Sequence, residues 1–166
     1  MRVPIRKSGQ YTHSKPDRYI TEKKLRECKD ELEKLKYVVQ QRAIVEVKRL
    51  AELGDFSENA EYQIAKGKLR GINARILELE QAVKNAVLIS SGGNTDCIRI
   101  GHRVTIGMDS KQKTYLILGS MESTPGKGII SHTSPIGAAL IGKKIGDTFT
   151  VKLAEKDVEC EVLGIE

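Results

Sequence analysis

Two acidic residues, Asp55 and Glu58, stand three positions apart in a short segment that interrupts two long apolar repeats. Two neighbouring carboxylates can share one Mg²⁺ ion while the ion keeps water and phosphate oxygens as its other ligands. Such an ion could serve as the second metal of a two-metal phosphoryl-transfer centre, if another protein supplies the rest of that centre. The pair therefore predicts a weak metal site that becomes complete only inside a partner.

The same spacing also has a purely structural explanation. An acid followed three residues later by a glutamate matches a capping box, in which both side chains bond to backbone amides at the start of a helix. Phe56, which lies between the two acids, argues for an external contact, because an aromatic side chain at the end of a rod has no core of its own. The sequence leaves both roles open for Asp55 and Glu58.

Basic residues stand on both sides of the acidic segment. Lys48 and Arg49 precede it, and Lys66, Lys68 and Arg70 follow it within a few helical turns. Positive side chains in these positions could hold a nucleic-acid backbone while the acids hold the metal. The alternative is an ordinary solvated helix surface, on which single ion pairs contribute little to stability.

Apolar residues at alternating spacings of three and four predict one long helix on each side of this segment. Thr21 is the expected N-cap of the first helix, with Ile20 packing on Leu25. After Val39 the apolar stripe leaves the strict heptad register and moves towards the period of a straight helix. Helices joined by so short a turn must lie antiparallel, so residues 20–86 should form a coiled-coil hairpin about 40 Å long with an acidic tip. The two stripes are Leu25, Cys28, Leu32, Leu35, Val39, Ala43, Val47 and Leu50, and then Ala65, Leu69, Ile72, Ile76, Leu79, Val83 and Ala86.

Two glycines, Gly67 and Gly71, lie inside the second predicted helix. Each costs about 1 kcal/mol relative to alanine in a helix interior, so their presence needs a reason. We expect them to let the two helices approach each other closely, with a functional kink as the alternative.

The remaining segments differ in pattern from the hairpin. From Val87 onwards the apolar period changes to two, which predicts a small α+β domain over residues 87–166. Residues 1–19 show no periodicity and predict a disordered basic tail. The expected elements of the second domain are antiparallel strands at 87–90, 98–106, 114–118, 128–131, 148–153 and 158–165, with one short helix at 135–141.

Composition narrows the range of functions. The formal net charge is +6 and all of it lies in the first 90 residues, mostly in the tail, which favours a polyanionic partner. An aromatic content of 4% argues against a protein that stacks single-stranded bases. The three cysteines, Cys28, Cys97 and Cys160, stand too far apart for a zinc motif and predict reduced thiols. We therefore expect a cytoplasmic protein with no membrane segment and no metal bound in isolation.

The segment 54–62, which reads GDFSENAEY, resembles the tip motif of the bacterial transcript-cleavage factors GreA and GreB. A second motif at residues 130–137, ISHTSPIG, and the residues that follow it resemble the C-terminal part of the same family. The likeness covers nearly everything from Ile20 to Glu166 and leans slightly towards GreA. It implies an N-terminal coiled-coil hairpin followed by a domain with an FKBP-like fold.

The resemblance also implies a function. In the family, the C-terminal domain docks on RNA polymerase, and the hairpin enters the secondary channel of that enzyme. Two acidic tip residues, matched here by Asp55 and Glu58, help to position Mg²⁺ and water, and the polymerase cleaves the 3′ end of its own backtracked RNA. The protein itself would then be no enzyme and would act as a monomer. The residues expected to dock are Ser131, Ser134, Pro135 and Ile136.

Three alternatives stay open from the sequence. A factor of the same shape could occupy the channel and inhibit the polymerase without stimulating cleavage. A prolyl isomerase is the enzymatic alternative, although Tyr115 and Phe149 are the only aromatic residues between 88 and 166 that could line its pocket. A coiled-coil adaptor that binds nucleic acid nonspecifically is the third.

Overall fold

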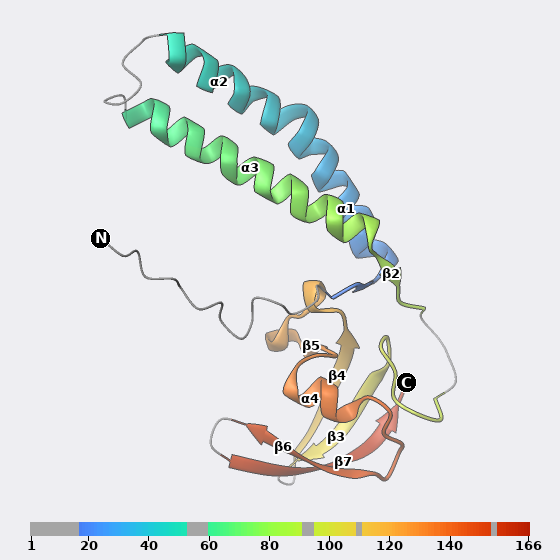
Figure 1. Cartoon of the computed structure of the whole chain (residues 1–166). Coiled ribbons are helices and arrows are strands. Elements are labelled where there is room, and N and C mark those ends of the chain that lie inside the picture. Colours follow the sequence, from blue (N-terminus) through green and yellow to red (C-terminus); the bar gives the residue numbers. More distant parts are fainter. Residues whose placement is uncertain (1–16, 53–59, 91–94, 109–110, 154–155) are drawn as a thin grey trace, which may run out of the picture.

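The computed structural model describes residues 17–52, 60–90, 95–108, 111–153 and 156–166. In these parts the chain forms a long helical hairpin with a sheet domain at its base (Figure 1). The predicted architecture, a helical hairpin followed by a mostly antiparallel sheet domain with one short helix, is confirmed. The elements are β1 (Tyr19–Ile20), α1 (Glu22–Lys34), a π-helical turn (Leu35–Val39), α2 (Gln40–Glu52), α3 (Ala60–Lys84), β2 (Val87–Leu88), β3 (Arg103–Met108), β4 (Lys111–Leu118), two 3₁₀ turns (Ser120–Glu122 and Pro125–Lys127), β5 (Ile129–Ser131), α4 (Pro135–Leu140), β6 (Thr148–Leu153) and β7 (Lys156–Ile165).

The hairpin begins where the sequence predicts. The Thr21 hydroxyl accepts a hydrogen bond from the Lys24 amide at 3.2 Å, which makes Thr21 the N-cap of α1. Ile20 is buried and packs in one apolar cluster with Leu25 and Leu79. The cap and the apolar contact across it together set how the chain enters α1.

The first arm is not the single continuous α-helix that the sequence predicted, although the apolar stripe predicted after Val39 is confirmed. Leu35–Val39 form a π-helical turn, and the Gln40 amide bonds to the Leu35 carbonyl five residues back. A π turn contains one residue more than an α turn. The turn therefore takes up the one residue by which the apolar spacing after Val39 exceeds the heptad repeat, and which would otherwise rotate the following apolar residues away from the second arm. As a result, Ala43, Val47 and Leu50 still face the second arm.

The second arm is one continuous helix, α3, and its predicted apolar stripe is confirmed. Ala65, Ile76 and Leu79 are buried, and the other stripe residues are half-buried. The expected role of Gly67 and Gly71 is wrong. Both glycines lie on the exposed side of α3, and a Cβ added at either position would meet nothing within 4 Å. They therefore face open solvent rather than the first arm.

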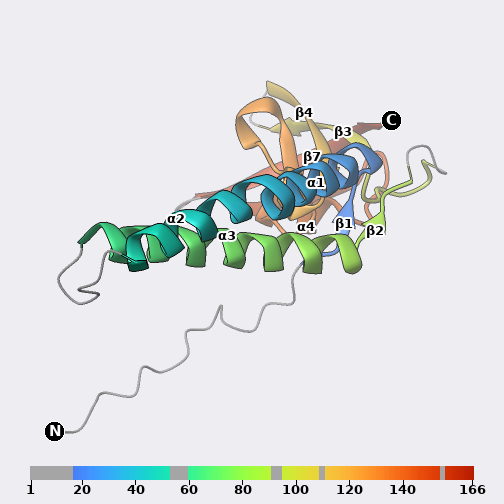
Figure 2. The ribbon, with the colours of Figure 1, turned by 90° about the horizontal axis from the view of Figure 1, so that it is seen from above.

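The two arms run antiparallel and lie side by side in two views that differ by 90° (Figures 1 and 2). Polar side chains join the arms along both sides of the apolar seam. The bonds are Gln40 Nε2 to Asn73 Oδ1 at 2.8 Å, Lys36 Nζ to Glu80 Oε1 at 2.5 Å, and Arg75 Nε to Glu31 Oε1 at 2.9 Å.

The sheet domain contains five strands in the order β5-β4-β3-β7-β6. Neighbouring strands are antiparallel except for β4 and β5, which pair in parallel, so the expected wholly antiparallel sheet is wrong at this edge. β3 begins at Arg103 rather than at the predicted 98, because a turn through Gly101, whose φ is +101°, precedes it. Ile98 is still part of the core, which also contains Val104, Ile106, Ile117, Ile130, Leu140, Phe149, Val151, Cys160 and Val162.

The hairpin and the sheet domain meet at a small junction. β1 and β2 pair in parallel, with Tyr19 opposite Val87 and Ile20 opposite Leu88. The predicted tail over residues 1–19 is therefore too long, since residues 17–19 belong to this junction, while residues 1–16 lie outside the described residues. Gly119 in the sheet domain is packed so closely that an added Cβ would lie 1.9 Å from the Tyr19 carbonyl oxygen.

Candidate nucleic-acid interface on the hairpin

The two predicted metal ligands, Asp55 and Glu58, lie outside the described residues. The helices that flank them end at Glu52 and begin at Ala60, and these two ends lie at the part of the hairpin farthest from the sheet domain (Figure 1). The acidic segment is thus the connection at the distal end of the rod. The metal-binding and capping roles of the two acids both stay predictions.

The basic residues near this end divide between two sides of the hairpin. The bond between Gln40 and Asn73 marks one side. Lys48 follows Gln40 by eight residues and Lys66 precedes Asn73 by seven, and helix positions separated in this way share a face. Arg70 lies one turn beyond Lys66 on the same face. We call Lys48, Lys66 and Arg70 the lysine side.

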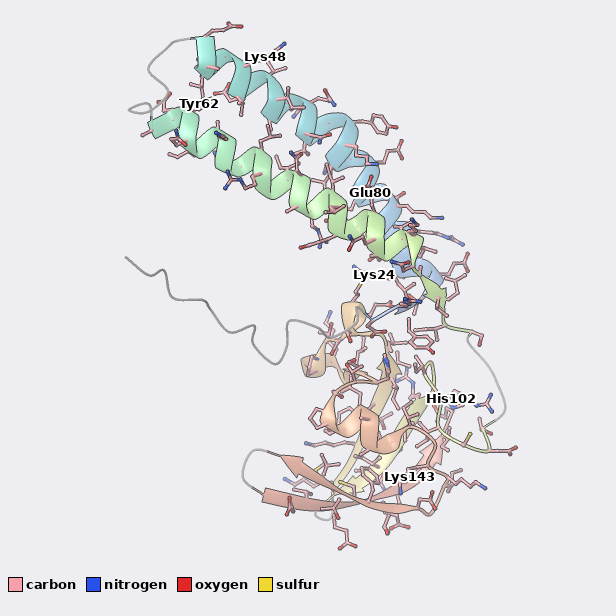
Figure 3. The ribbon with its side chains drawn as sticks, in the orientation of Figure 1. Lys24, Lys48, Tyr62, Glu80, His102 and Lys143 are labelled. Carbon is pink, nitrogen blue, oxygen red and sulfur yellow. The ribbon has the colours of Figure 1, made fainter. Side chains whose placement is uncertain are left out.

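The lysine side is open to solvent and carries an aromatic ring. All three basic side chains are exposed, and none of them forms an ion pair with another described residue. The Lys66 ammonium lies 5.8 Å from the centre of the Tyr62 ring, within the range of a cation–π contact. Lys48 and Tyr62 lie near the distal ends of their helices (Figure 3). Within the described part of the chain, this side therefore presents positive charge without an ion-pair partner, close to the distal end of the hairpin.

On the opposite side, positive charge is neutralised within the hairpin. Arg49 donates two hydrogen bonds to Glu46, from Nε at 3.0 Å and from Nη2 at 2.8 Å. These bonds lower the pKa of the Glu46 carboxyl and raise that of the Arg49 guanidinium. Lys68 lines the same groove as Glu46 and Glu61. We call Arg49, Lys68, Glu46 and Glu61 the paired side.

The five residues predicted to contact nucleic acid therefore do not form one surface. The structure brings Lys48, Lys66 and Arg70 together and places Arg49 and Lys68 on the other side. The spacing between Glu46 and Arg49, three residues in one helix, was visible in the sequence and could have indicated that Arg49 is paired.

The four predicted docking residues each have a local role in the fold. Ser131 is buried, and its carbonyl accepts a hydrogen bond from the Ser134 hydroxyl at 2.6 Å. Ser134 caps α4 by accepting from the Gly137 amide at 3.1 Å, and Pro135 occupies the first turn of that helix. Ile136 packs against the core of the sheet domain. Their role in docking stays a prediction.

Two carboxylates that the sequence did not single out connect the hairpin to the sheet domain. The Glu122 carboxylate accepts hydrogen bonds from the Thr21 amide at 2.8 Å and from the Thr21 hydroxyl at 2.6 Å. The Asp17 carboxylate accepts from the Ser120 amide at 2.5 Å and from the Tyr19 amide at 3.1 Å. No sequence signal could have revealed these contacts, because the bonded residues in each cross-domain pair stand more than 100 positions apart.

These contacts change the acidity of Asp17. Burial alone would raise the pKa of its carboxyl, but hydrogen bonding by the Ser120 and Tyr19 amides and by the Ser120 side chain contributes to a pKa below the ordinary value of 3.8. His132 adds a weaker effect in the same direction, with its Nδ1 at 3.4 Å from Asp17 Oδ2. Asp17 is therefore held in the charged form at neutral pH.

Two protein-family models together match nearly all of the chain. Residues 18–88 match the family described as "Transcription elongation factor, N-terminal", and residues 93–166 match "Transcription elongation factor, GreA/GreB, C-term". Transcription elongation factor GreA of Mesoplasma florum is 40% identical over 136 residues, which cover 80% of this chain and 87% of that protein. Its namesake from Bacillus licheniformis is 37% identical over 149 residues, which cover 88% and 94%.

A solved structure, "Structure of the transcription factor Gfh1", aligns with a TM-score of 0.42 at 25% identity, covering 88% of this chain and 95% of that chain. Among the described residues, no helix is both long and apolar enough to cross a membrane. The two family matches divide the chain where the structure passes from the hairpin to the sheet domain. Since these two matches together cover most of the chain and a GreA protein is 40% identical to it, the chain belongs to the GreA/GreB family of transcription elongation factors.

Proposed function

We propose that this protein binds RNA polymerase and stimulates the polymerase to cleave its own backtracked RNA, so that arrested transcription can resume. The hairpin would carry Asp55 and Glu58 into the polymerase active site, where their carboxylates would hold Mg²⁺. Membership of the GreA/GreB family supports this proposal, and so does the presence of both acids in the distal connection of the hairpin.

The observation that carries the proposal furthest is the asymmetry of the hairpin. Lys48, Lys66 and Arg70 present positive charge on one side only, and they do so next to the acidic connection. A phosphate backbone that approached the tip would meet, on that side, three cations that pair with no described residue, and on the paired side an arginine already bonded to Glu46. The RNA would therefore follow the lysine side, with its 3′ end directed towards the tip.

The chemistry of the tip suits a shared metal. Carboxylate oxygens are the ligands that Mg²⁺ prefers, and one or two of them leave coordination positions for water and phosphate. When bound, the ion would lower the pKa of a water molecule and neutralise charge on the phosphate that is cut. The part played by this chain is to place two carboxylates and to align the RNA. Two carboxylates cannot form a nuclease centre alone, so the protein would act by completing the centre of the polymerase rather than as an enzyme.

The sheet domain gives little support to the prolyl isomerase alternative. Phe149 lies in the core with 9% of its surface exposed, and Tyr115 packs against the same core. The two aromatic side chains that could have lined a proline pocket thus serve the fold.

The test is RNA cleavage in stalled, backtracked complexes of the cognate polymerase with Mg²⁺. The wild-type protein should speed cleavage, and Asp55→Asn combined with Glu58→Gln should abolish this effect while binding to the polymerase persists. Full stimulation by that double variant would contradict the metal-holding role. If the wild-type protein instead binds and blocks the polymerase without stimulating cleavage, the result would support the alternative that this protein is an inhibitor of the polymerase.

A matched pair of variants tests the path of the RNA. Lys66→Ala with Arg70→Ala removes two charges from the lysine side, and Arg49→Ala with Lys68→Ala removes two charges from the paired side. We expect the first pair to weaken cleavage stimulation far more than the second, because Lys66 and Arg70 pair with no described residue, whereas Arg49 is bonded to Glu46 and Lys68 shares a groove with Glu46 and Glu61. An equal loss from both pairs, or a larger loss from the second, would refute the asymmetry.

A further inference from the structure

The first arm of the hairpin receives part of its N-terminal cap from the sheet domain. Thr21 caps α1 through its hydroxyl oxygen, and the same hydroxyl donates its hydrogen to Glu122 Oε1. The second oxygen of Glu122 accepts from the Thr21 amide. One carboxylate thus accepts from both hydrogen-bond donors of Thr21 at the positive end of a helix dipole, where a negative charge is stabilising.

A second carboxylate, that of Asp17, joins the hairpin and the sheet domain on the other side of strand β1. Asp17 precedes β1 and accepts from the Ser120 amide of the sheet domain, whereas Glu122 belongs to the sheet domain and accepts from the Thr21 amide just after β1. Ser120 and Glu122 are the two ends of one 3₁₀ turn. The hairpin and the sheet domain therefore exchange carboxylate–amide bonds on both sides of Tyr19 and Ile20.

We propose that Glu122 and Asp17 are positioning residues that fix the angle between the hairpin and the sheet domain, and so set where the acidic tip reaches when the factor is bound. Two separated attachment points resist rotation about β1, which a single point would permit. Hydrogen bonds to a charged carboxylate are about twice as strong as neutral ones, so the pair forms a firm clamp.

The length of the hairpin makes this angle important. With its 25 residues, α3 extends about 37 Å along its axis. A rotation of about 10° at the base would therefore move the distal end by about 6 Å. Misplacement by about 1 Å can cost about a hundredfold in rate when a catalytic group must be aligned. A loose base would leave polymerase binding intact while taking the tip away from the metal.

The inference rests on the proposed function for its consequence in cleavage, but the clamp itself can be measured without the polymerase. Spin labels placed at Tyr37→Cys on the first arm and Lys113→Cys on β4, in a Cys97→Ser background, report the distance between the two parts by pulsed electron paramagnetic resonance. Both label sites are exposed, and Cys28 and Cys160 are buried. The distribution should be narrow in the otherwise unchanged protein.

The variants remove the clamp in steps. Glu122→Ala with Asp17→Ala should broaden the distance distribution, and Glu122→Gln, which keeps an acceptor for the Thr21 amide, should broaden it less. Glu27→Ala is the matched control, since Glu27 is an acid on α1 near the same junction, and its side chain, which pairs with Lys24 of the same helix, is 51% exposed. The control should leave the distribution unchanged, and circular dichroism should show that all variants keep their helices.

Cleavage assays then separate positioning from folding. The clamp variant should lower the maximal cleavage rate at saturating factor by at least about tenfold, with little change in the concentration that half-saturates the polymerase. Glu122→Gln should recover much of that rate. A distribution as narrow in the double alanine variant as in the parent protein, or an unchanged maximal rate with a broadened distribution, would overturn the inference. If the wild type stimulates no cleavage, the proposed function fails, and the distance measurement still decides whether the clamp exists.

Discussion

Replacing Gly67 and Gly71 by alanine should stabilise the hairpin. Both positions lie in the middle of α3, both are exposed, and a Cβ added there would meet nothing within 4 Å. Alanine in an exposed helix interior is favoured over glycine by about 1 kcal/mol, chiefly because glycine loses more backbone freedom on folding. The two sites lie one helical turn apart, but a methyl group added at either meets nothing within 4 Å, so the two effects should sum to about 2 kcal/mol. For a chain of this size that corresponds to an increase in the midpoint of thermal unfolding of about 4–8 °C.

Thermal unfolding followed by far-ultraviolet circular dichroism measures this change directly, since α3 contributes much of the helical signal. Gly137→Ala is the control, and we expect it to lower the free energy of unfolding rather than raise it. Gly137 is also helical, but an added Cβ would lie 2.1 Å from the Ser131 carbonyl oxygen and should destabilise the sheet domain by at least about 1 kcal/mol. If Gly67→Ala and Gly71→Ala are neutral or destabilising, the face of α3 that carries them is covered in solution. Sedimentation analysis would then be expected to show a dimer rather than the predicted monomer.

Three further predictions follow from burial and charge. Leu79→Ala should cost about 2–5 kcal/mol in urea unfolding because Leu79 is fully buried at the hairpin base, whereas Leu77→Ala, at a position 56% exposed, should change stability by less than about 0.5 kcal/mol. Cys97, which is half-exposed, should react with Ellman's reagent in the native protein, whereas Cys28 should react only after unfolding, because burial shields its thiol and raises its pKa. Asp17→Asn should destabilise the protein at neutral pH, because an acid with a lowered pKa stabilises the fold above its ordinary pKa. That difference should vanish as the pH falls through the lowered value, and a difference that persists in acid would contradict the charge-dependent role.

The long helices were predictable because their signals are local and repeated. A stripe of apolar residues at spacings of three and four recurs through both arms, and the cap at Thr21 stands directly before the first of them. The strands β4, β6 and β7 were found within a few residues for the same reason. The π-helical turn was visible only as a change of spacing after Val39, which a straight-helix period explained equally well.

Contacts between distant segments could not be predicted. Asp17 stood in a segment without periodicity and Glu122 in a turn, and nothing in either neighbourhood indicates that each bonds to the other part of the protein. The two sides on which the basic residues lie were accessible from the sequence. Lys66 and Lys68 stand two positions apart on one helix, and such positions do not share a face. Asp55 and Glu58 were chosen from type and spacing, and they stay predictions because they lie outside the described residues.

The π-helical turn at Leu35–Val39 has a consequence for how the hairpin tolerates changes in length. The turn holds one residue more than an α-helical turn would, and the apolar positions on its two sides are otherwise in phase. If one residue of the turn were deleted, the apolar residues before and after the turn would follow a single heptad register. An ordinary α-helix could then replace the turn. The same deletion anywhere else in the first arm would rotate everything beyond it by about 100° and turn the apolar face outwards. The first arm therefore has one place where a lost residue can be absorbed without turning its apolar face away from the second arm.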